Sequence, residues 1–321
     1  MKIDNKILYV IIGIITFYTL FLVYSDLELV IDKLSNFKIE FIPLILGLVV
    51  LSWIVIFYRW SLLLRHSGIK IPTKENFSIF VSGFALSIIP GKAGELIKSQ
   101  FLKNKFGISR KKTFLIVFLE QLYNLIGLVI VSFSGLILIS IFKIQFFEFA
   151  FYVVFIVTGI TIFFFIIINS KKIFQKIFLK ISKIKFIAKY EITFEDSYAL
   201  LKTSSRGKIF LYSTSLSVLF WILESIIVFL ILLGFHIDMI EFLSIISTYT
   251  ISLMLGSVSF LPMGIGVVEV SLVGFLTLQG VDFSLALTNV ILIRIFTRWL
   301  GVSVGIISLK IIGGFSSNTS E

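Results

Sequence analysis

The fold is decided at Ile89-Pro90-Gly91-Lys92-Ala93-Gly94-Glu95, where a proline, two glycines and two opposite charges interrupt an apolar run. A looser copy of this break follows at Leu261-Pro262-Met263-Gly264-Ile265-Gly266-Val267-Val268-Glu269. Proline and glycine stop helices, and a helix stopped inside lipid needs protein or a water-lined cavity to cover its free backbone groups. Paired breaks in the two halves of a membrane protein therefore predict a binding site between them.

The composition places the chain among all-α polytopic membrane proteins. Of its 321 residues, 58% are hydrophobic and 16% aromatic, and the mean hydropathy is +1.07. The net charge of +11 comes from Lys and Arg gathered between apolar segments, which the positive-inside rule explains better than nucleic-acid binding does. Because there is no cysteine and the two histidines, His66 and His236, lie far apart, we expect no disulfide, metal or cofactor. No catalytic set of residues is predicted.

Six apolar runs are long enough to span a membrane, because about 20 residues suffice. The first follows Lys2 and Lys6 and is too long for a signal peptide, so we expect it to be retained. The runs are Ile7–Tyr24, Phe41–Leu64, Thr113–Ile141, Phe149–Asn169, Ile209–Leu233 and Ser284–Leu309. The Lys and Arg bias of the loops predicts that both termini lie in the cytoplasm. The membrane is expected to be the plasma membrane.

Two further apolar segments are predicted to form re-entrant helical hairpins around the breaks. The first hairpin has the arms Phe77–Ile89 and Leu96–Phe106, each near a dozen residues or roughly 20 Å, which is short of a ~30 Å hydrocarbon core. The second has Phe242–Leu261 and Val267–Leu278. Phe242–Leu261 is also long enough to span, and its many serines and threonines indicate a helix that faces protein or water.

The chain, taken as one membrane domain over 1–321, has an internal repeat. Pro90 and Gly94 align with Pro262 and Gly266, and with small shifts Gly107-Ile108-Ser109 aligns with Gly280-Val281-Asp282. Glu120 and Asn124 then align with Arg294 and Arg298. The units are 41–141 and 209–309, and the charge bias of their flanks predicts that they have inverted topology.

The segment 171–208 between the units is the longest polar connection. We predict that its first half is a basic amphipathic helix lying on the inner leaflet, where anionic lipids attract it. One of its faces carries Lys172, Lys176, Lys180 and Lys183, and the other is apolar.

Several charges fall inside apolar segments, where each costs roughly 2.5–3.5 kcal/mol and so needs a reason. They either pair with one another to fix helix packing or bind a charged headgroup. Arg59, next to Tyr58 and Trp60, is interpreted instead as an interface anchor. The predicted substrate-binding residues are Gly91, Lys92, Gly94, Glu95, Lys98, Glu120, Glu224, Gly264, Gly266, Glu269, Arg294 and Arg298.

The motif Pro90-Gly91-Lys92-Ala93-Gly94-Glu95, followed by Lys98, resembles the lysylphosphatidylglycerol synthase transmembrane-region family. The resemblance continues through Glu120, Pro262 to Glu269, Gly280-Val281 and Arg294. Where members often carry a Glu-Arg pair and an aspartate, this chain has Gln121 and Asn124 beside Glu120. The resemblance implies movement of an aminoacylated or glycosylated lipid between leaflets. Some relatives are linked to polyprenyl-phosphate glycosylation.

These observations predict a flippase-like lipid translocator. Lys92, Arg294 and Arg298 would hold the headgroup phosphate, while Glu95 and Glu269 would hold its amine or hydroxyls. Glu120 and Glu224 would orient the cations. One alternative is a membrane enzyme, or an accessory subunit, of polyprenyl-phosphate-linked glycosylation, with Glu95 or Glu269 as general base. Another is a scaffold for a lipid synthase or glycosyltransferase partner. Since no soluble domain follows Leu309, we expect that the chain does not make the lipid.

Overall fold

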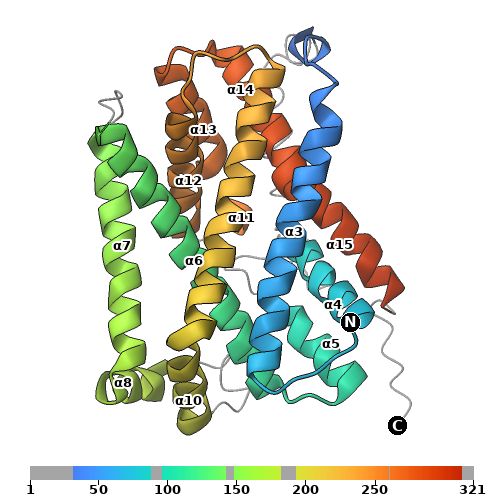
Figure 1. Ribbon diagram of the computed structural model, residues 1–321, viewed down its shortest axis with the longest axis vertical. Helices are drawn as coiled ribbons and strands as arrows, with labels where there is room; N and C mark the ends of the chain where they lie inside the picture. Colours follow the sequence, from blue (N-terminus) through green and yellow to red (C-terminus); the bar gives the residue numbers. More distant parts are fainter. Residues whose placement is uncertain (1–31, 88–95, 142–147, 182–192, 260, 313–321) are drawn as a thin grey trace.

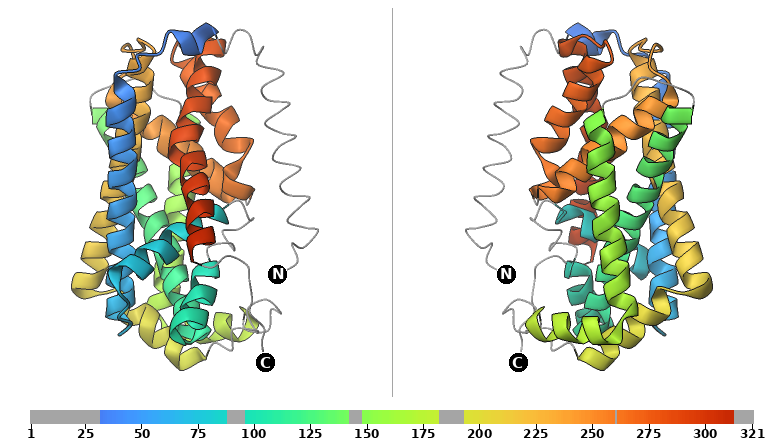
Figure 2. Two further views of the ribbon diagram at one scale, coloured as in Figure 1. Left: turned by 90° about the vertical axis from the view of Figure 1, so that its right-hand side faces the viewer. Right: turned by 90° about the vertical axis from the view of Figure 1, so that its left-hand side faces the viewer.

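The computed structural model describes residues 32–87, 96–141, 148–181, 193–259 and 261–312, and these residues form helices and no strand (Figure 1). The first break, at 89–95, and the first predicted span, Ile7–Tyr24, lie outside the described residues. The long helices run broadly along the long axis of the molecule and form one bundle (Figures 1 and 2).

Five of the six predicted spans lie within the described residues, and each is a helix long and apolar enough to cross a membrane. Four are uninterrupted α-helices: α3 (Phe41–His66), α6 (Arg110–Ile141), α7 (Glu148–Asn169) and α11 (Gly207–Gly234). The fifth, Phe283–Ile311, consists of α14 (Phe283–Arg294), η3 (Ile295–Trp299) and α15 (Leu300–Ile311). The protein is therefore a multi-pass membrane protein.

The arms of the predicted hairpins are short helices. In the first half they are α4 (Thr73–Ala85) and α5 (Ile97–Phe106), and in the second half α12 (Phe242–Val258) and α13 (Val267–Leu278). Even α12, with 17 residues, is only about 26 Å long, which is less than a ~30 Å hydrocarbon core. Five of its serines and threonines are buried as expected, each at most 4% exposed: Ser244, Ser247, Thr248, Thr250 and Ser252. Ser257, near its end, is exposed.

The two pairs of short helices lie at different levels of the bundle. In Figure 1, α4 and α5 lie in the lower half, which also contains α8 (Lys171–Ile181) and α10 (Phe194–Ser204), whereas α12 and α13 lie in the upper half. Each first arm packs on a long helix of the other half of the chain. Helix α4 packs along α15, and α12 packs along α6.

The contact between α4 and α15 depends on a glycine. A Cβ added to Gly305 would lie 2.4 Å from the backbone nitrogen of Ala85 and 3.0 Å from the carbonyl oxygen of Val81. The Ser308 hydroxyl donates to the Ser78 carbonyl at 2.9 Å and joins the same two helices. Small residues let helix backbones approach closely in a membrane, as the spacing of Gly301 and Gly305 suggests.

The last span differs from the continuous α-helix that its sequence predicts. One turn of π-helix, η3, separates α14 from α15. A π turn widens the helix locally, and such turns are frequent at functional sites. This turn contains Arg298, one of the predicted substrate-binding residues.

Candidate functional site

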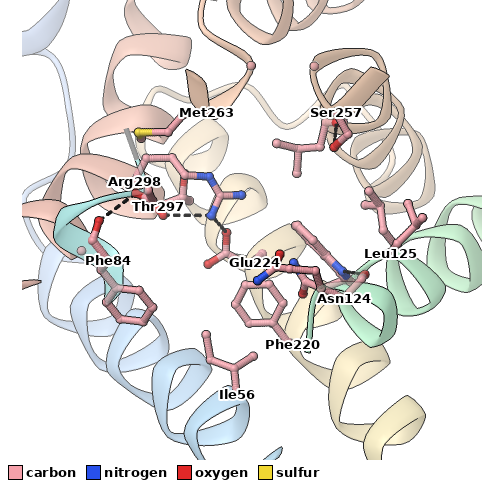
Figure 3. Close-up of a pocket in the computed structure, with 18 of the residues that line it drawn as sticks. Ile56, Phe84, Asn124, Leu125, Phe220, Glu224, Ser257, Met263, Thr297 and Arg298 are labelled. Atoms are coloured by element: carbon pink, nitrogen blue, oxygen red, sulfur yellow. Dashed lines mark hydrogen bonds and ion pairs between the residues drawn. The ribbon is translucent and has the colours of Figure 1, made fainter. Parts of the chain in front are cut away.

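A cavity of about 390 Å³ lies between helices contributed by both halves of the chain (Figure 3). This volume is within the range of small-molecule sites, which are mostly apolar with a few polar groups that orient the ligand. The lining residues are Trp53, Ile56, Arg59, Phe84, Ser87, Glu120, Gln121, Asn124, Leu125, Leu128, Phe220, Trp221, Glu224, Leu253, Gly256, Ser257, Leu261, Met263, Gly264, Val268, Thr297, Arg298 and Gly301.

One wall of the cavity carries an arginine and a glutamate that point toward each other (Figure 3). Arg298, in the π turn, places Nη1 3.6 Å from Oε2 of Glu224 on α11. The Tyr249 hydroxyl, from α12, donates to the same carboxylate oxygen at 2.8 Å. The Arg298 side chain is 22% exposed, whereas that of Glu224 is 1% exposed. The guanidinium therefore faces the cavity, while the carboxylate lies behind it and is held by Tyr249.

A second arginine lines the cavity from α3. Arg59 is 2% exposed, and its Nη1 lies 2.6 Å from the Ser217 hydroxyl and 3.5 Å from Oδ1 of Asn124. The Asn124 carbonyl accepts a hydrogen bond from the Trp221 indole at 2.9 Å, and the Arg298 guanidinium lies 6.0 Å from the centroid of that indole. The Asn124–Trp221 pair thus links the two arginines of the cavity.

The first hairpin is joined to the following span by a buried ion pair. Nζ of Lys98, on α5, lies 2.5 Å from Oε2 of Glu120, on α6, and the two side chains are 2% and 4% exposed. The ammonium also lies 4.6 Å from the centroid of the Trp60 ring, which favours a buried cation. Glu120 reaches the cavity wall, but its carboxylate is already paired with Lys98.

The second hairpin is joined to its following span in the same way. Nε of Arg294, on α14, lies 2.7 Å from Oε1 of Glu269, on α13, and both side chains are at most 2% exposed. The other carboxylate oxygen accepts a hydrogen bond from the Gly266 amide at 2.7 Å, so Glu269 caps the N-terminus of α13. Arg294 Nη2 donates to the Met263 carbonyl at 2.9 Å. The pair therefore holds the break itself.

The break at 262–266 adopts a backbone that glycine favours. Gly264 and Gly266 have φ angles of 67° and 87°. A Cβ on Gly264 would lie 2.9 Å from the Cα atom of Gly256, so the loop sits directly on α12. Met263, which lies between Pro262 and Gly264, has a strained backbone with φ 52°. Arg294 stabilises this strained residue because it binds the Met263 carbonyl.

Comparison with known proteins supports the resemblance that the motif around residues 90–95 suggests. The family model described as lysylphosphatidylglycerol synthase TM region matches residues 9–305. The chain belongs to this family. A UPF0104 membrane protein of Methanocaldococcus jannaschii is 27% identical over 235 residues, which is 71% of this chain and 94% of that protein. One from Pyrococcus horikoshii is 26% identical over 331 residues, covering 94% of this chain and 95% of that protein.

The structure brings together only part of the predicted site of this family member. Glu120, Glu224, Gly264 and Arg298 line the cavity. Four others lie in or beside the ion pairs that hold the hairpins: Lys98, Gly266, Glu269 and Arg294. The remaining four, Gly91, Lys92, Gly94 and Glu95, lie outside the described residues.

Two polar groups of the cavity wall, Arg59 and Trp221, were not among the predicted site residues. Neither was Tyr249, which lies behind the wall and binds Glu224. The interpretation of Arg59 as an interface anchor is wrong, since its side chain is buried and bonded to α6 and α11. The sequence held a signal for its burial. Ser52 and Arg59 are both polar, are seven residues apart and so share one face of the apolar helix α3, which indicates that this face packs on protein. Trp221 and Tyr249 have no such signal, because only the packing of α11 and α12 shows their partners.

Proposed function

We propose that this protein is a lipid translocator that binds the phosphate-containing headgroup of a lipid in the cavity and passes it between the two leaflets. Apolar side chains form most of the cavity wall, and two arginines supply cations that match a phosphate. The acyl chains would stay in the bilayer. An amine or sugar on the headgroup would lie near Glu224, so an aminoacylated or glycosylated lipid is the expected cargo.

The observation that carries this proposal is a difference between three buried ion pairs of the described residues. The Lys98–Glu120 and Arg294–Glu269 pairs are 2.5 and 2.7 Å long, and their side chains are at most 4% exposed. The Arg298–Glu224 pair is 3.6 Å long, with the arginine 22% exposed. A short, dry pair supports packing, whereas a long pair at a cavity can exchange the carboxylate for a ligand phosphate. Arg298 is therefore the proposed ligand-binding cation.

We infer that the two units form an inverted repeat, as their sequences suggest. Three features support this. The first arms lie at opposite levels and pack reciprocally, α4 on α15 and α12 on α6. The second arms are followed by glycines with positive φ, Gly107 at 65° and Gly280 at 94°. Each second arm is joined to the next span by an ion pair with reversed charges. Such repeats are common in transporters.

The π turn is the proposed hinge for movement of one unit against the other. Before it, α14 is fixed to the second hairpin by the Arg294–Glu269 pair. After it, α15 is fixed to α4 of the first unit by the close approach at Gly305. Relative motion of the units would thus change η3, which contains Arg298. A ligand bound to Arg298 would favour one arrangement, which is the differential contact that such a transition requires.

The enzymatic alternative is less well supported within the described residues. A general base must reach a substrate proton, but Glu269 is 0% exposed and accepts from both Arg294 and the Gly266 amide.

The basic residues of α5 and α8 lie toward one end of the bundle (Figure 1). We propose that this end faces the cytoplasm of a plasma membrane, the side on which the sequence predicts both termini.

The test is exposure of a labelled lipid headgroup in vesicles that contain the purified protein. Arg298→Gln should lower the rate at least about tenfold, because a hydrogen bond to a charged group contributes roughly 1.5–3 kcal/mol. Arg65→Gln, at an exposed arginine near the end of α3, serves as the control and should keep the wild-type rate. A wild-type rate in Arg298→Gln would overturn the proposed role of the cavity.

A further inference from the structure

Helix α8 lies where a membrane surface is expected. It begins at Lys171, and only Ser170 separates it from the end of α7 at Asn169. In Figure 2 this yellow-green helix lies across the lower end of the bundle. The last turns of α7 expose apolar side chains suited to lipid, with Phe163 at 59% and Ile166 at 52%. Since α7 crosses the membrane, α8 is confined to the neighbourhood of one leaflet.

The main apolar face of α8 is covered by protein. Phe174 is 9% exposed, and its ring lies 5.8 Å from that of Phe194 and 5.6 Å from that of Tyr198, both on α10. Phe178 lies 5.9 Å from Phe194. These aromatic contacts show that the apolar face of α8 packs on α10 and is not exposed to lipid.

The opposite face of α8 is basic and has no partner within the described chain. Lys172, Lys176 and Lys180 are exposed and are spaced by four, so they form one stripe. At about 100° per residue, Lys176 lies roughly 200° around the helix from Phe174. Ile173, 41% exposed, and Leu179, 56% exposed, flank the stripe. Three cations between two exposed apolar side chains match an interface of anionic headgroups and acyl chains.

We propose that this stripe, Lys172, Lys176 and Lys180, is a binding site for the headgroups of anionic phospholipids in the adjacent leaflet. An acidic protein would match the charge alone, whereas a lipid surface also matches the flanking apolar side chains and the tether to α7. Each lysine is expected to contribute about fivefold to the association with an anionic surface. Lys183, which the sequence adds to the stripe, lies outside the described residues. This site does not depend on the proposed translocation.

The absence of native cysteine allows a direct test on the whole chain. Leu179→Cys carries an environment-sensitive fluorophore, and the protein is placed in phosphatidylcholine nanodiscs with or without phosphatidylglycerol. Quenching by headgroup spin labels should rise with phosphatidylglycerol and fall with added salt. The triple variant Lys172→Gln, Lys176→Gln, Lys180→Gln should lose this response.

A matched triple variant, Lys70→Gln, Lys74→Gln, Lys103→Gln, changes exposed lysines elsewhere and should keep the response. Native mass spectrometry gives a second measurement, in which only the α8 triple variant should retain less phosphatidylglycerol. Quenching that ignores phosphatidylglycerol, or an α8 triple variant that behaves like its control, would overturn the proposal. Capture of an acidic protein by α8 without any lipid dependence would do the same.

Discussion

Replacing Arg294 by methionine would show whether the Arg294–Glu269 pair holds the second break or binds ligand. Methionine keeps much of the aliphatic stem but removes the cation. Glu269, at 0% exposure, would then keep only the Gly266 amide as donor among the contacts described above, and the Met263 carbonyl would lose its donor at 2.9 Å. The expected effect is thus on the stability of the protein.

The size of the effect follows from this geometry. Removing one partner of a buried ion pair costs about 3–5 kcal/mol, because the remaining buried charge loses its counter-ion. The free energy of unfolding of Arg294→Met should fall by that amount. Adding Glu269→Gln removes the second charge and keeps an oxygen for the Gly266 amide, so the double variant should recover part of the loss. The two changes should couple by at least about 1 kcal/mol.

Reversible denaturant unfolding in mixed micelles measures these free energies, with Arg65→Met, at an exposed arginine, as the matched control. The control should unfold within about 0.5 kcal/mol of wild type. If Arg294→Met unfolds like the control while headgroup exposure is lost, the arginine acts on ligand. A short, buried ion pair would then bind ligand as well, and the assignment of Arg294–Glu269 to packing alone would be wrong.

Two other predictions concern the stability of the helix bundle. Gly305→Val should separate α4 from α15 and lower the free energy of unfolding, because a Cβ at this position would lie 2.4 Å from a backbone nitrogen of α4. In the same assay Gly47→Ala, whose Cβ would meet nothing within 4 Å, should leave the free energy of unfolding unchanged. Asp282 caps α14, and hydrogen bonds from the Ser284 hydroxyl and from backbone amides lower the pKa of its carboxyl. Asp282→Ala should therefore cost about 0.5–2 kcal/mol at neutral pH. Since the pKa is lower in the folded state, this contribution is complete above the ordinary pKa near 4 and is lost as the pH falls through the folded value, whereas Asp282→Asn should show no such loss.

The sequence by itself determined the membrane class and most of the helices. A span requires only a continuous apolar run, which is a local property, so the predicted Phe149–Asn169 differs from the observed Glu148–Asn169 by one residue. The second break was also predictable, because Pro262 and two glycines cannot continue an α-helix. The motif around residues 90–95 was sufficient to indicate the family.

Tertiary structure alone decided which buried charges pair and which face the cavity. Arg294 and Arg298 are four residues apart and look equivalent in sequence, yet one lies against α13 in a dry pair and the other reaches Glu224 across the cavity wall. The same holds for Arg59 and for the apolar face of α8, which α10 covers. The physical reason is that burial and pairing depend on neighbouring helices that are distant in sequence, whereas helix formation in a membrane depends on the residues of the segment itself.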